Sequence, residues 1–260
     1  MKIYENVKIG ADPELFLIDE TGKFISSVGL IGGTKEVPLP IDNEGNCLQE
    51  DNVSVEFNIK PASSKQEFLG SINKVLDVLE ERMREKKLFL SIVPATEFHW
   101  DQLQTMQAQT FGCEPDFNAW TGEKNPTPFC DNLQLRSAGG HIHVGYDKPN
   151  QINKMNLIRA MDVFLGVPSV KHDADVMRRK LYGKPGAFRP KKYGAEYRTL
   201  SNFWIKTKEM QEWAYEQTMK AISFLNAGGN VPFSEQVFIH QVLFEKDENS
   251  FKYLQEKYSF

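Results

Sequence analysis

The sequence of 260 residues predicts an α+β protein in which strands and helices are largely segregated along the chain. Residues 6–60 hold short runs of alternating apolar and polar residues broken by Gly, Pro, Asn and Asp, as in antiparallel strands and their turns. The last third instead has apolar residues three and four positions apart, which is helical spacing. Neither an internal repeat nor a long linker interrupts the chain, so we expect one domain over residues 1–260.

The first part of the chain predicts strands followed by one long helix. Three segments share the strand alternation: 7–19, 23–33 and 52–61. Ser64 and Glu67 then form the pattern of a capping box, and apolar residues recur at helical spacing through 67–87. The N-terminal region is therefore expected to form a sheet with a helix beside it.

The middle of the chain mixes strand-like and irregular segments. A strand is expected at 88–95, whereas residues 111–132 follow neither period, which is typical of a long functional loop. Strand character returns at 133–146, and Asn150 is placed to cap a helix that extends to residue 166.

The remaining elements are mostly helical. We expect a helix at 173–183, a loop at 184–192 and a strand at 193–204. Two further helices are predicted at 208–229, which ends in a pair of glycines, and at 234–246.

Composition limits the classes of partner. The formal net charge of −4 gives no general attraction to nucleic acid, so no direct nucleic-acid binding is expected. No apolar run approaches the roughly 20 residues of a membrane span, and the start of the chain alternates like a strand instead of resembling a signal peptide. We therefore expect a soluble, cytoplasmic protein with no membrane partner. Three widely spaced cysteines, Cys47, Cys113 and Cys130, predict reduced thiols.

Polar side chains recur two positions apart within the predicted strands, and such residues share one strand face. Three pairs have this spacing: Asp12 with Glu14, His141 with His143, and Glu196 with Arg198. Glu56 points away from its apolar neighbours Val55 and Phe57. Taken singly, these patterns are equally typical of a solvated strand face, a packed histidine pair or a surface ion pair. Gly139, Gly140 and Gly145 beside the histidines remove side chains where a ligand or another backbone can approach.

Taken together, these side chains are chemically coherent. Carboxylates with one imidazole suit Mg²⁺ or Mn²⁺, which are hard ions that prefer oxygen ligands. Mg²⁺ held by carboxylates, together with arginines, is a common means of binding the phosphates of ATP. Neither GxxxxGK[ST] nor GxGxxG occurs, so a sheet surface would have to hold the nucleotide.

The chain resembles the carboxylate–amine ligases of the glutamine synthetase and glutamate–cysteine ligase superfamily, and within it the compact amidoligases often encoded by bacteriophages. The stretches that carry the likeness are, in order, GADPELFL, DNVSVEFNIKPA, FGCEPDFNAW, SAGGHIHVGY and KLYGKPGAFRPKKYGAEYRTLSNFW. The resemblance implies a curved antiparallel sheet that forms an open funnel or half barrel, with helices packed outside it.

The resemblance also implies residue roles. The implied metal ligands are Asp12, Glu14, Glu56, His141 and Glu196. The implied contacts to the phosphates of ATP are His143, Arg189 and Arg198. The implied catalytic group is Glu56, Glu196, Arg189 and Arg198. Glu50 or Asp51 would have to supply any further carboxylate, which leaves the number of metal ions open.

The leading hypothesis is an ATP- and Mg²⁺-dependent carboxylate–amine ligase that forms an amide or peptide bond through an acyl phosphate. Its partners would be a small-molecule or peptide carboxylate and an amine, and a homo-oligomer is possible. If a phage encodes the chain, it would work in the host cytoplasm. The loop at 111–132, with Cys113 and Asp116, is either the acceptor pocket or a packed loop with an inert cysteine.

Two alternatives use the same residues differently. A metal-dependent hydrolase would use His141 and His143 as ligands and Glu56 or Glu196 as base, but it needs a third close ligand and leaves the arginines without a role. A non-catalytic binding or virion-associated module would have kept the fold without needing the whole acidic set.

Overall fold

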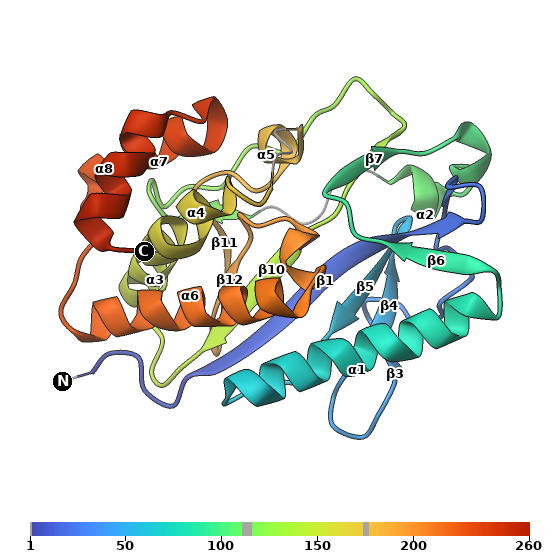
Figure 1. Cartoon of the computed structure of the whole chain (residues 1–260), viewed down its shortest axis with the longest axis horizontal. Coiled ribbons are helices and arrows are strands. Elements are labelled where there is room, and N and C mark those ends of the chain that lie inside the picture. Colours follow the sequence, from blue (N-terminus) through green and yellow to red (C-terminus); the bar gives the residue numbers. More distant parts are fainter. Residues whose placement is uncertain (1, 111–115, 174–176) are drawn as a thin grey trace.

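The protein is described from a computed structural model, which covers residues 2–110, 116–173 and 177–260. Ten strands form one large open sheet, and the long helices pack on one of its faces (Figure 1). The predicted α+β class is therefore confirmed. Within the described residues the sheet ends at two different strands and does not close into a barrel.

The ten-stranded sheet has the central order β3-β4-β5-β1-β10-β12-β11-β8, and its pairs are antiparallel. Its strands are β1 (Lys8–Asp19), β2 (Phe24–Ile25), β3 (Leu39–Pro40), β4 (Cys47–Asp51), β5 (Ser54–Asn58), β6 (Leu88–Ser91), β8 (Phe117–Asn118), β10 (Gly140–Gly145), β11 (Ala187–Lys191) and β12 (Gly194–Tyr197). The short strands β7 (Ala95–Glu97) and β9 (Leu135–Ser137) pair with each other.

Strand β1 brings distant parts of the sequence into register. Asp12 lies opposite His141 on β10, and Glu14 lies opposite Glu56 on β5. On the far side of β10, His143 lies opposite Glu196 on β12. Residues from three separate regions of the chain are thereby placed side by side on the sheet.

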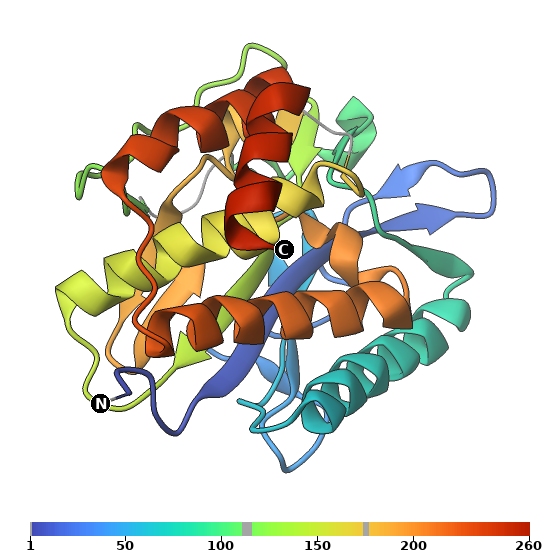
Figure 2. The ribbon, with the colours of Figure 1, turned by 60° about the vertical axis from the view of Figure 1, so that its left-hand side comes forward.

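Three long helices cover one face of the sheet: α1 (Lys65–Arg84), α3 (Gln151–Met161) and α6 (Lys208–Asn226). The oxygen of Ser64 accepts the N–H of Glu67, and Asn150 forms a capping box with Asn153, so both predicted helix starts are confirmed. In Figure 2 the C-terminal helices, including α8 (Glu248–Tyr258), lie beyond α3 on the same side of the sheet.

The remaining helical elements are short. They are the 3₁₀ segments Trp100–Gln102, Asn202–Ile205 and Phe233–Glu235, the π-helical segments Asp162–Gly166 and Gln241–Glu245, and the helices α2 (Met106–Gln109), α4 (Val167–Ser169), α5 (Met177–Leu181) and α7 (Gln236–His240). None of the helices within the described ranges is both long and apolar enough to cross a membrane.

Alternation along the strands separates an apolar face from a polar one. The side chains buried toward the helices include Ile9, Ala11 and Leu15 of β1, Val55 and Phe57 of β5, and Ile142 and Val144 of β10. Phe68, Ile72 and Val75 of α1 belong to the same core. Asp12, Glu14, Glu56, His141 and His143 alternate with these residues, so they lie on the face that the helices leave open.

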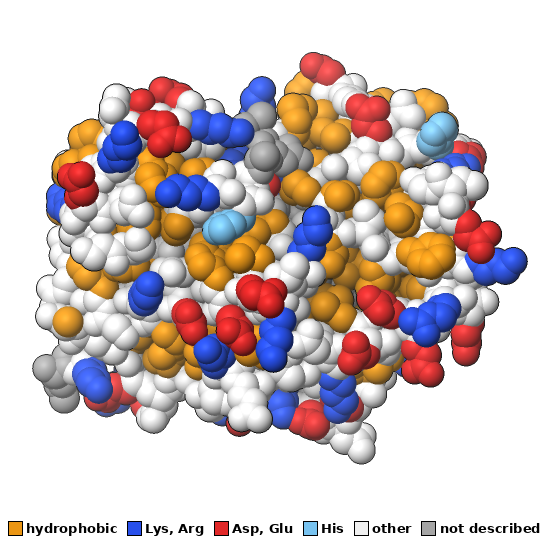
Figure 3. All heavy atoms as spheres, viewed as in Figure 1, with side chains coloured by type: hydrophobic (Ala, Val, Ile, Leu, Met, Phe, Trp, Pro, Cys, Tyr) orange, Lys and Arg blue, Asp and Glu red, His pale blue; other side chains and the backbone are white. Residues whose placement is uncertain are grey.

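The helix-covered face is chemically mixed. Figure 3 shows acidic and basic side chains scattered among apolar ones on this side, without one large area of a single charge. The outer surface of the helical layer is therefore a solvated face, and the charge of functional interest lies on the other side of the sheet.

Three sequence predictions need correction. The segment 23–33 forms only the two-residue strand β2, because Gly29, Gly32 and Gly33 adopt positive φ and the backbone turns around the Glu50 carboxylate. The predicted loop at 184–192 instead contains β11, which pairs with β12.

Proline explains why β11 escaped detection. Pro190 is disfavoured within central strands because it lacks a backbone N–H. Among the residues that the structure describes, the pairing of β11 with β8 ends at Phe188, so no described ladder bond to that neighbour is lost at Pro190. The predicted strand at 193–204 is also shorter than expected: β12 ends at Tyr197, and a 3₁₀ segment occupies the end of the range.

Candidate functional site

A cavity of about 1110 Å³ lies against the open face of the sheet. Its walls come from β1, β4, β5, β10 and β11 and from the segments that follow β10 and β12. Of the residues singled out from the sequence, the lining includes Asp12, Glu14, Glu56, His141, His143, Arg189 and Arg198. Glu196 contacts Arg198 at the edge of the same cavity, so the whole predicted set is brought together.

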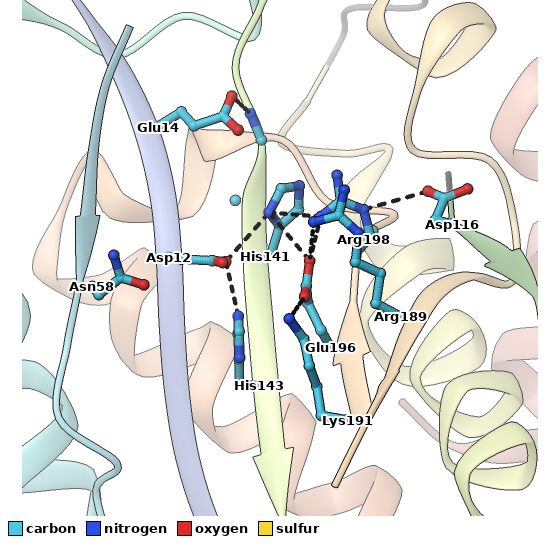
Figure 4. A network of polar contacts seen from close by, with 12 residues as sticks. Asp12, Glu14, Asn58, Asp116, His141, His143, Arg189, Lys191, Glu196 and Arg198 are labelled. Carbon is cyan, nitrogen blue, oxygen red and sulfur yellow. Dashed lines mark hydrogen bonds and ion pairs between the residues drawn. The ribbon is translucent and has the colours of Figure 1, made fainter. Parts of the chain in front are cut away.

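Asp12 is the centre of the imidazole contacts. Its Oδ1 lies 2.9 Å from Nε2 of His143 and 3.3 Å from Nδ1 of His141 (Figure 4). Burial opposes ionisation of Asp12, but the two imidazoles outweigh it and hold the pKa of this carboxyl well below its usual range. Asp12 is therefore an anion with two nitrogen partners.

Glu196 is fully buried and is surrounded by cations. Nζ of Lys191 lies 2.7 Å from its Oε2, Nη1 of Arg189 lies 3.5 Å from its Oε1, and the guanidinium of Arg198 donates to the same Oε1 (Figure 4). Burial and the charge of Asp12 raise the pKa of Glu196, yet the cations, led by Arg198, lower it to about 2. Arg198 also reaches Asp116, whose Oδ2 is 3.3 Å from its Nε.

The two histidines differ in electrostatic state. Burial and the positive charge of Arg198 lower the pKa of His141 to about 4, so its imidazole is neutral near pH 7. Burial also opposes charging of His143, but the Asp12 carboxylate dominates and raises its pKa. Nδ1 of His143 lies 2.5 Å from the hydroxyl of Tyr193, and the two rings stack.

A second group of acidic side chains lies where β1 pairs with β5. Glu14, Asp51 and Glu56 offer carboxylate oxygens that all lie within 4.8 Å of one another. Glu14 also accepts the backbone N–H of Gly139 at 2.8 Å. Burial, followed by the charge of Asp51, raises the pKa of Glu14 to about 7. Burial and the three neighbouring acids raise the pKa of Glu56 well above its usual range.

This second group fits a hard divalent cation. Three partly buried carboxylates at this spacing repel one another, and an ion such as Mg²⁺ or Mn²⁺ would neutralise them with the oxygen ligands it prefers. Asp12, His143 and Glu196 also have the spacing of a metal site. Their carboxylates already have cationic partners, however, so an ion there would have to displace them.

The ligand groups differ in detail from those that the family resemblance implied. Asp51 joins Glu14 and Glu56, whereas the Glu50 carboxylate accepts backbone N–H groups from the turn at 29–32 and serves the loop instead. His143 is the imidazole that completes the group with Asp12 and Glu196, although His141 was the implied ligand.

The three glycines beside the histidines have different structural roles. A Cβ on Gly139 would collide with the His141 ring, and one on Gly140 would collide with the carbonyl of Ser201. Gly145 lines the main cavity and has room for a methyl group, with Tyr193 at 3.6 Å. The first two glycines are therefore required by close packing, whereas the third borders the main cavity.

Two residues at the site, Lys191 and Tyr193, were not predicted from the sequence. Lys191 is two positions from Arg189, which was predicted, and both side chains reach Glu196, a pattern that the prediction of a loop at 184–192 concealed. Tyr193 was missed because an aromatic residue beside a turn carries no specific signal. Within the predicted loop, Asp116 forms an ion pair with Arg198, and Asn118 belongs to β8. Cys113 lies outside the described residues.

Comparison with known families agrees with this arrangement. Residues 131–222 match the family model described as "Phage phiEco32-like COOH.NH2 ligase-type 2". Over this segment the chain is similar to the phage-type COOH–NH2 ligases. The predicted resemblance is thereby confirmed. No curated protein matched the sequence.

The matched segment of the COOH–NH2 ligase family contains only one side of the site. It spans β10, β11 and β12 and so includes both histidines, Arg189, Glu196 and Arg198. Asp12, Glu14 and Glu56 lie outside it, and only the sheet register brings them against the matched strands.

Proposed function

We propose that the protein is an ATP- and Mg²⁺-dependent carboxylate–amine ligase that joins an acid to an amine through an acyl phosphate. The observation that carries the proposal is the pairing, within one cavity, of a group of carboxylates that has no ion pair among the described residues with a group of arginines and a lysine. The first suits a divalent cation, and the second suits the phosphates of a nucleotide. The name of the matching family supports this class of reaction.

Glu14, Asp51 and Glu56 would hold the cation. When bound, Mg²⁺ neutralises charge on the transferring phosphate and orients it. Arg189 and Arg198 lie on the opposite side of Asp12 and would stabilise the negative charge that develops on the phosphoryl oxygens. Lys191 and His143 line the same wall and would contact other phosphate oxygens.

The chemistry requires little beyond positioning. The carboxylate oxygen of the acid attacks the γ-phosphorus, ADP leaves, and the amine nitrogen then attacks the acyl carbon and expels phosphate. The cavity provides the preorganised charges for the first step, because Glu196 and Asp116 fix the Arg198 guanidinium before any ligand arrives. We further propose that the sheet is of the curved glutamine synthetase type.

Nucleotide use tests the proposal directly. Purified protein with Mg²⁺ is expected to be stabilised by ATP and to release ADP and phosphate when given a suitable acid and amine from a panel. Glu14→Ala and Glu196→Ala are expected to abolish this release. Glu235→Gln is the control, because Glu235 is, like Glu196, a buried glutamate with a basic partner, and its partner Lys257 lies outside the cavity.

The control separates loss of function from loss of folding. All three variants are to be compared by thermal unfolding, and the Glu235 variant is expected to keep ADP release at the level of the unchanged protein. Absence of binding by ATP and by a non-hydrolysable analogue at millimolar concentration, with tight binding of zinc, would show that the ligase proposal is wrong.

The hydrolase alternative is less well supported. Asp12 and Glu196 do supply the further ligands that a centre with His143 would need. Both carboxylates are engaged by cationic side chains, and the hydrolase would leave Arg189, Lys191 and Arg198 without a role. Tight zinc binding without nucleotide binding is the result that would favour it.

A further inference from the structure

A buried carboxylate on the helix-covered side of the sheet contacts both neighbours of Arg198. Asp162 follows α3, begins the π-helical segment and is fully buried, and it does not line the large cavity. Its Oδ1 accepts a hydrogen bond from the hydroxyl of Tyr197 at 2.9 Å and lies 3.3 Å from the hydroxyl of Thr199. Asp162 therefore holds the chain on each side of Arg198.

Alternation at the end of β12 explains why these contacts affect Arg198. Side chains of successive residues point to opposite faces of a sheet, so Tyr197 packs among the helices while Arg198 lines the cavity. The backbone of Arg198 is also fixed within the sheet, because its N–H donates to the carbonyl of Ala187 at 2.9 Å. The guanidinium thus projects into the cavity from a backbone that is held from behind.

The other oxygen of Asp162 holds the segment that supplies the carboxylate partner of Arg198. Oδ2 accepts the indole N–H of Trp120 at 2.7 Å, and the backbone N–H of Trp120 donates to the side chain of Asn118 in β8 at 2.8 Å. Asp116, two residues before Asn118, is the residue whose Oδ2 lies 3.3 Å from Nε of Arg198. One buried carboxylate is therefore bonded to both segments that set the place of this guanidinium.

This arrangement is costly for folding. Asp162 has no cationic partner among the described ion pairs, and burial raises its pKa to about 7 although its hydrogen bonds lower it. A buried polar network whose members are hydrogen-bonded fixes one arrangement of the segments it joins. Gly166 of the same π-helical segment leaves room for the contact, because a Cβ there would lie 2.7 Å from the hydroxyl of Tyr197. Such π-helical turns are frequent at functional sites.

We propose that Asp162 is a positioning residue for Arg198. The inference rests on the proposed ligase function, in which Arg198 stabilises the transferring γ-phosphate. Asp162 lies behind the sheet and acts through Tyr197, Thr199 and Trp120, so it touches neither nucleotide nor substrate. Loss of its hydrogen bonds should therefore weaken recognition of the γ-phosphate and leave the rest of the nucleotide contacts unchanged.

The test compares a non-hydrolysable ATP analogue with ADP, because only the analogue has a group in the place of the γ-phosphate. Calorimetric titrations with Mg²⁺ give the two dissociation constants, and their ratio measures the preference for the γ-phosphate. Asp162→Asn keeps the size of the side chain and replaces one acceptor oxygen by a donor. It is expected to lower this preference by about fivefold or more, which corresponds to one hydrogen bond.

Two tyrosines provide a matched pair that separates positioning from stability. Tyr197→Phe removes the hydroxyl bond to Asp162, and Tyr4→Phe removes another buried hydroxyl bond, to the carbonyl of Asn153 in α3 at 2.7 Å. Tyr4 does not line the large cavity. Thermal unfolding should show similar losses of stability, whereas only Tyr197→Phe should reduce the preference for the ATP analogue, by about fivefold.

A second readout needs no ligand. The Nε–H signal of Arg198 in the NMR spectrum reports its contact with Asp116, and it should shift in Tyr197→Phe and stay in place in Tyr4→Phe. An unshifted signal in Tyr197→Phe would overturn the positioning role.

The outcomes separate this inference from the ligase proposal. If the analogue binds but Tyr197→Phe keeps the preference of the unchanged protein, loses affinity for ADP equally, or behaves like Tyr4→Phe, the positioning role is wrong and the ligase proposal stands. If the unchanged protein binds no nucleotide, the ligase proposal fails, and the Arg198 signal still decides whether Asp162 positions this side chain. If Asp162→Asn does not fold, the two tyrosine variants decide the question.

Discussion

Replacing Glu14 with glutamine is expected to stabilise the metal-free protein near neutral pH while removing its response to divalent cations. Glu14 lies in a partly buried group with Asp51 and Glu56, and no cationic side chain is in contact with its carboxylate among the described ion pairs. Its ionised form is therefore disfavoured in the folded chain. Glutamine keeps an oxygen that can accept the N–H of Gly139.

The expected magnitude follows from the pKa of Glu14. Burial and Asp51 raise this pKa from 4.5 to about 7, which corresponds to about 3 kcal/mol of folding free energy as an upper limit. Because the folded-state pKa is the higher one, the favourable contribution is complete below about pH 4.5 and is lost as the pH rises through about 7. The glutamine variant does not undergo this loss.

Urea unfolding in EDTA at about pH 5 and about pH 8 measures the effect. Between the two pH values, the unchanged protein should lose stability through Glu14, and Glu14→Gln should lose up to about 3 kcal/mol less. Adding Mg²⁺ should stabilise the unchanged protein and not the variant.

Glu196→Gln is the comparison of opposite sign. The cations around Glu196 lower its pKa to about 2, so its contribution to stability is present above the unfolded value of 4.5 and is lost as the pH falls through about 2. Removing its charge should destabilise the protein at about pH 8 by about 3 kcal/mol, because three basic groups lose their carboxylate. Equal destabilisation by the two substitutions in EDTA would refute the assignment of Glu14 to a group of carboxylates that has no ion pair among the described residues.

Three further predictions test the site and its support. Mg²⁺ binding near pH 7 should release protons, because burial raises the pKa of Glu14 to about 7 and raises that of Glu56 well above its usual range. Titrations in buffers of different ionisation enthalpy would detect this release, and a buffer-independent heat would contradict it. Asp162→Ala should lower the free energy of unfolding by about 3 kcal/mol, because the buried Asp162 carboxylate accepts hydrogen bonds from Trp120 and Tyr197. A change below about 1 kcal/mol in urea unfolding would argue against this network. Gly140→Ala should unfold or strongly destabilise the chain, because the added methyl group would collide with the carbonyl of Ser201. Gly145→Ala on the same strand should change the free energy of unfolding by less than about 1 kcal/mol. Similar melting temperatures of the two variants would contradict this prediction.

Strand alternation allowed the two faces of the sheet to be predicted with accuracy. The buried Val55 and Phe57, with Glu56 pointing away, follow directly from the period of two, and so do Ile142 and Val144 around the histidines. The start of α1 was equally legible, because a capping residue and helical spacing act within a few residues of one another.

Longer-range features were harder to predict. The turn around Glu50 depends on three glycines and a carboxylate whose partners are contributed by a segment about 20 residues earlier. Strand β11 contains a proline that is acceptable only because of where its pairing with β8 ends. The charge state of a carboxyl group likewise depends on partners from other strands, which no local pattern contains.

By itself, the sequence determined which residue types share a strand face, where the main helices begin and which family the chain resembles, since these depend on local period, capping and motif. The tertiary structure alone decided that Glu14, Asp51 and Glu56 form one acidic group while Asp12 pairs with histidines and Glu196 pairs with arginines and a lysine. The physical reason is that pairing register and burial, which set distances and pKa values, arise only when strands far apart in the sequence meet.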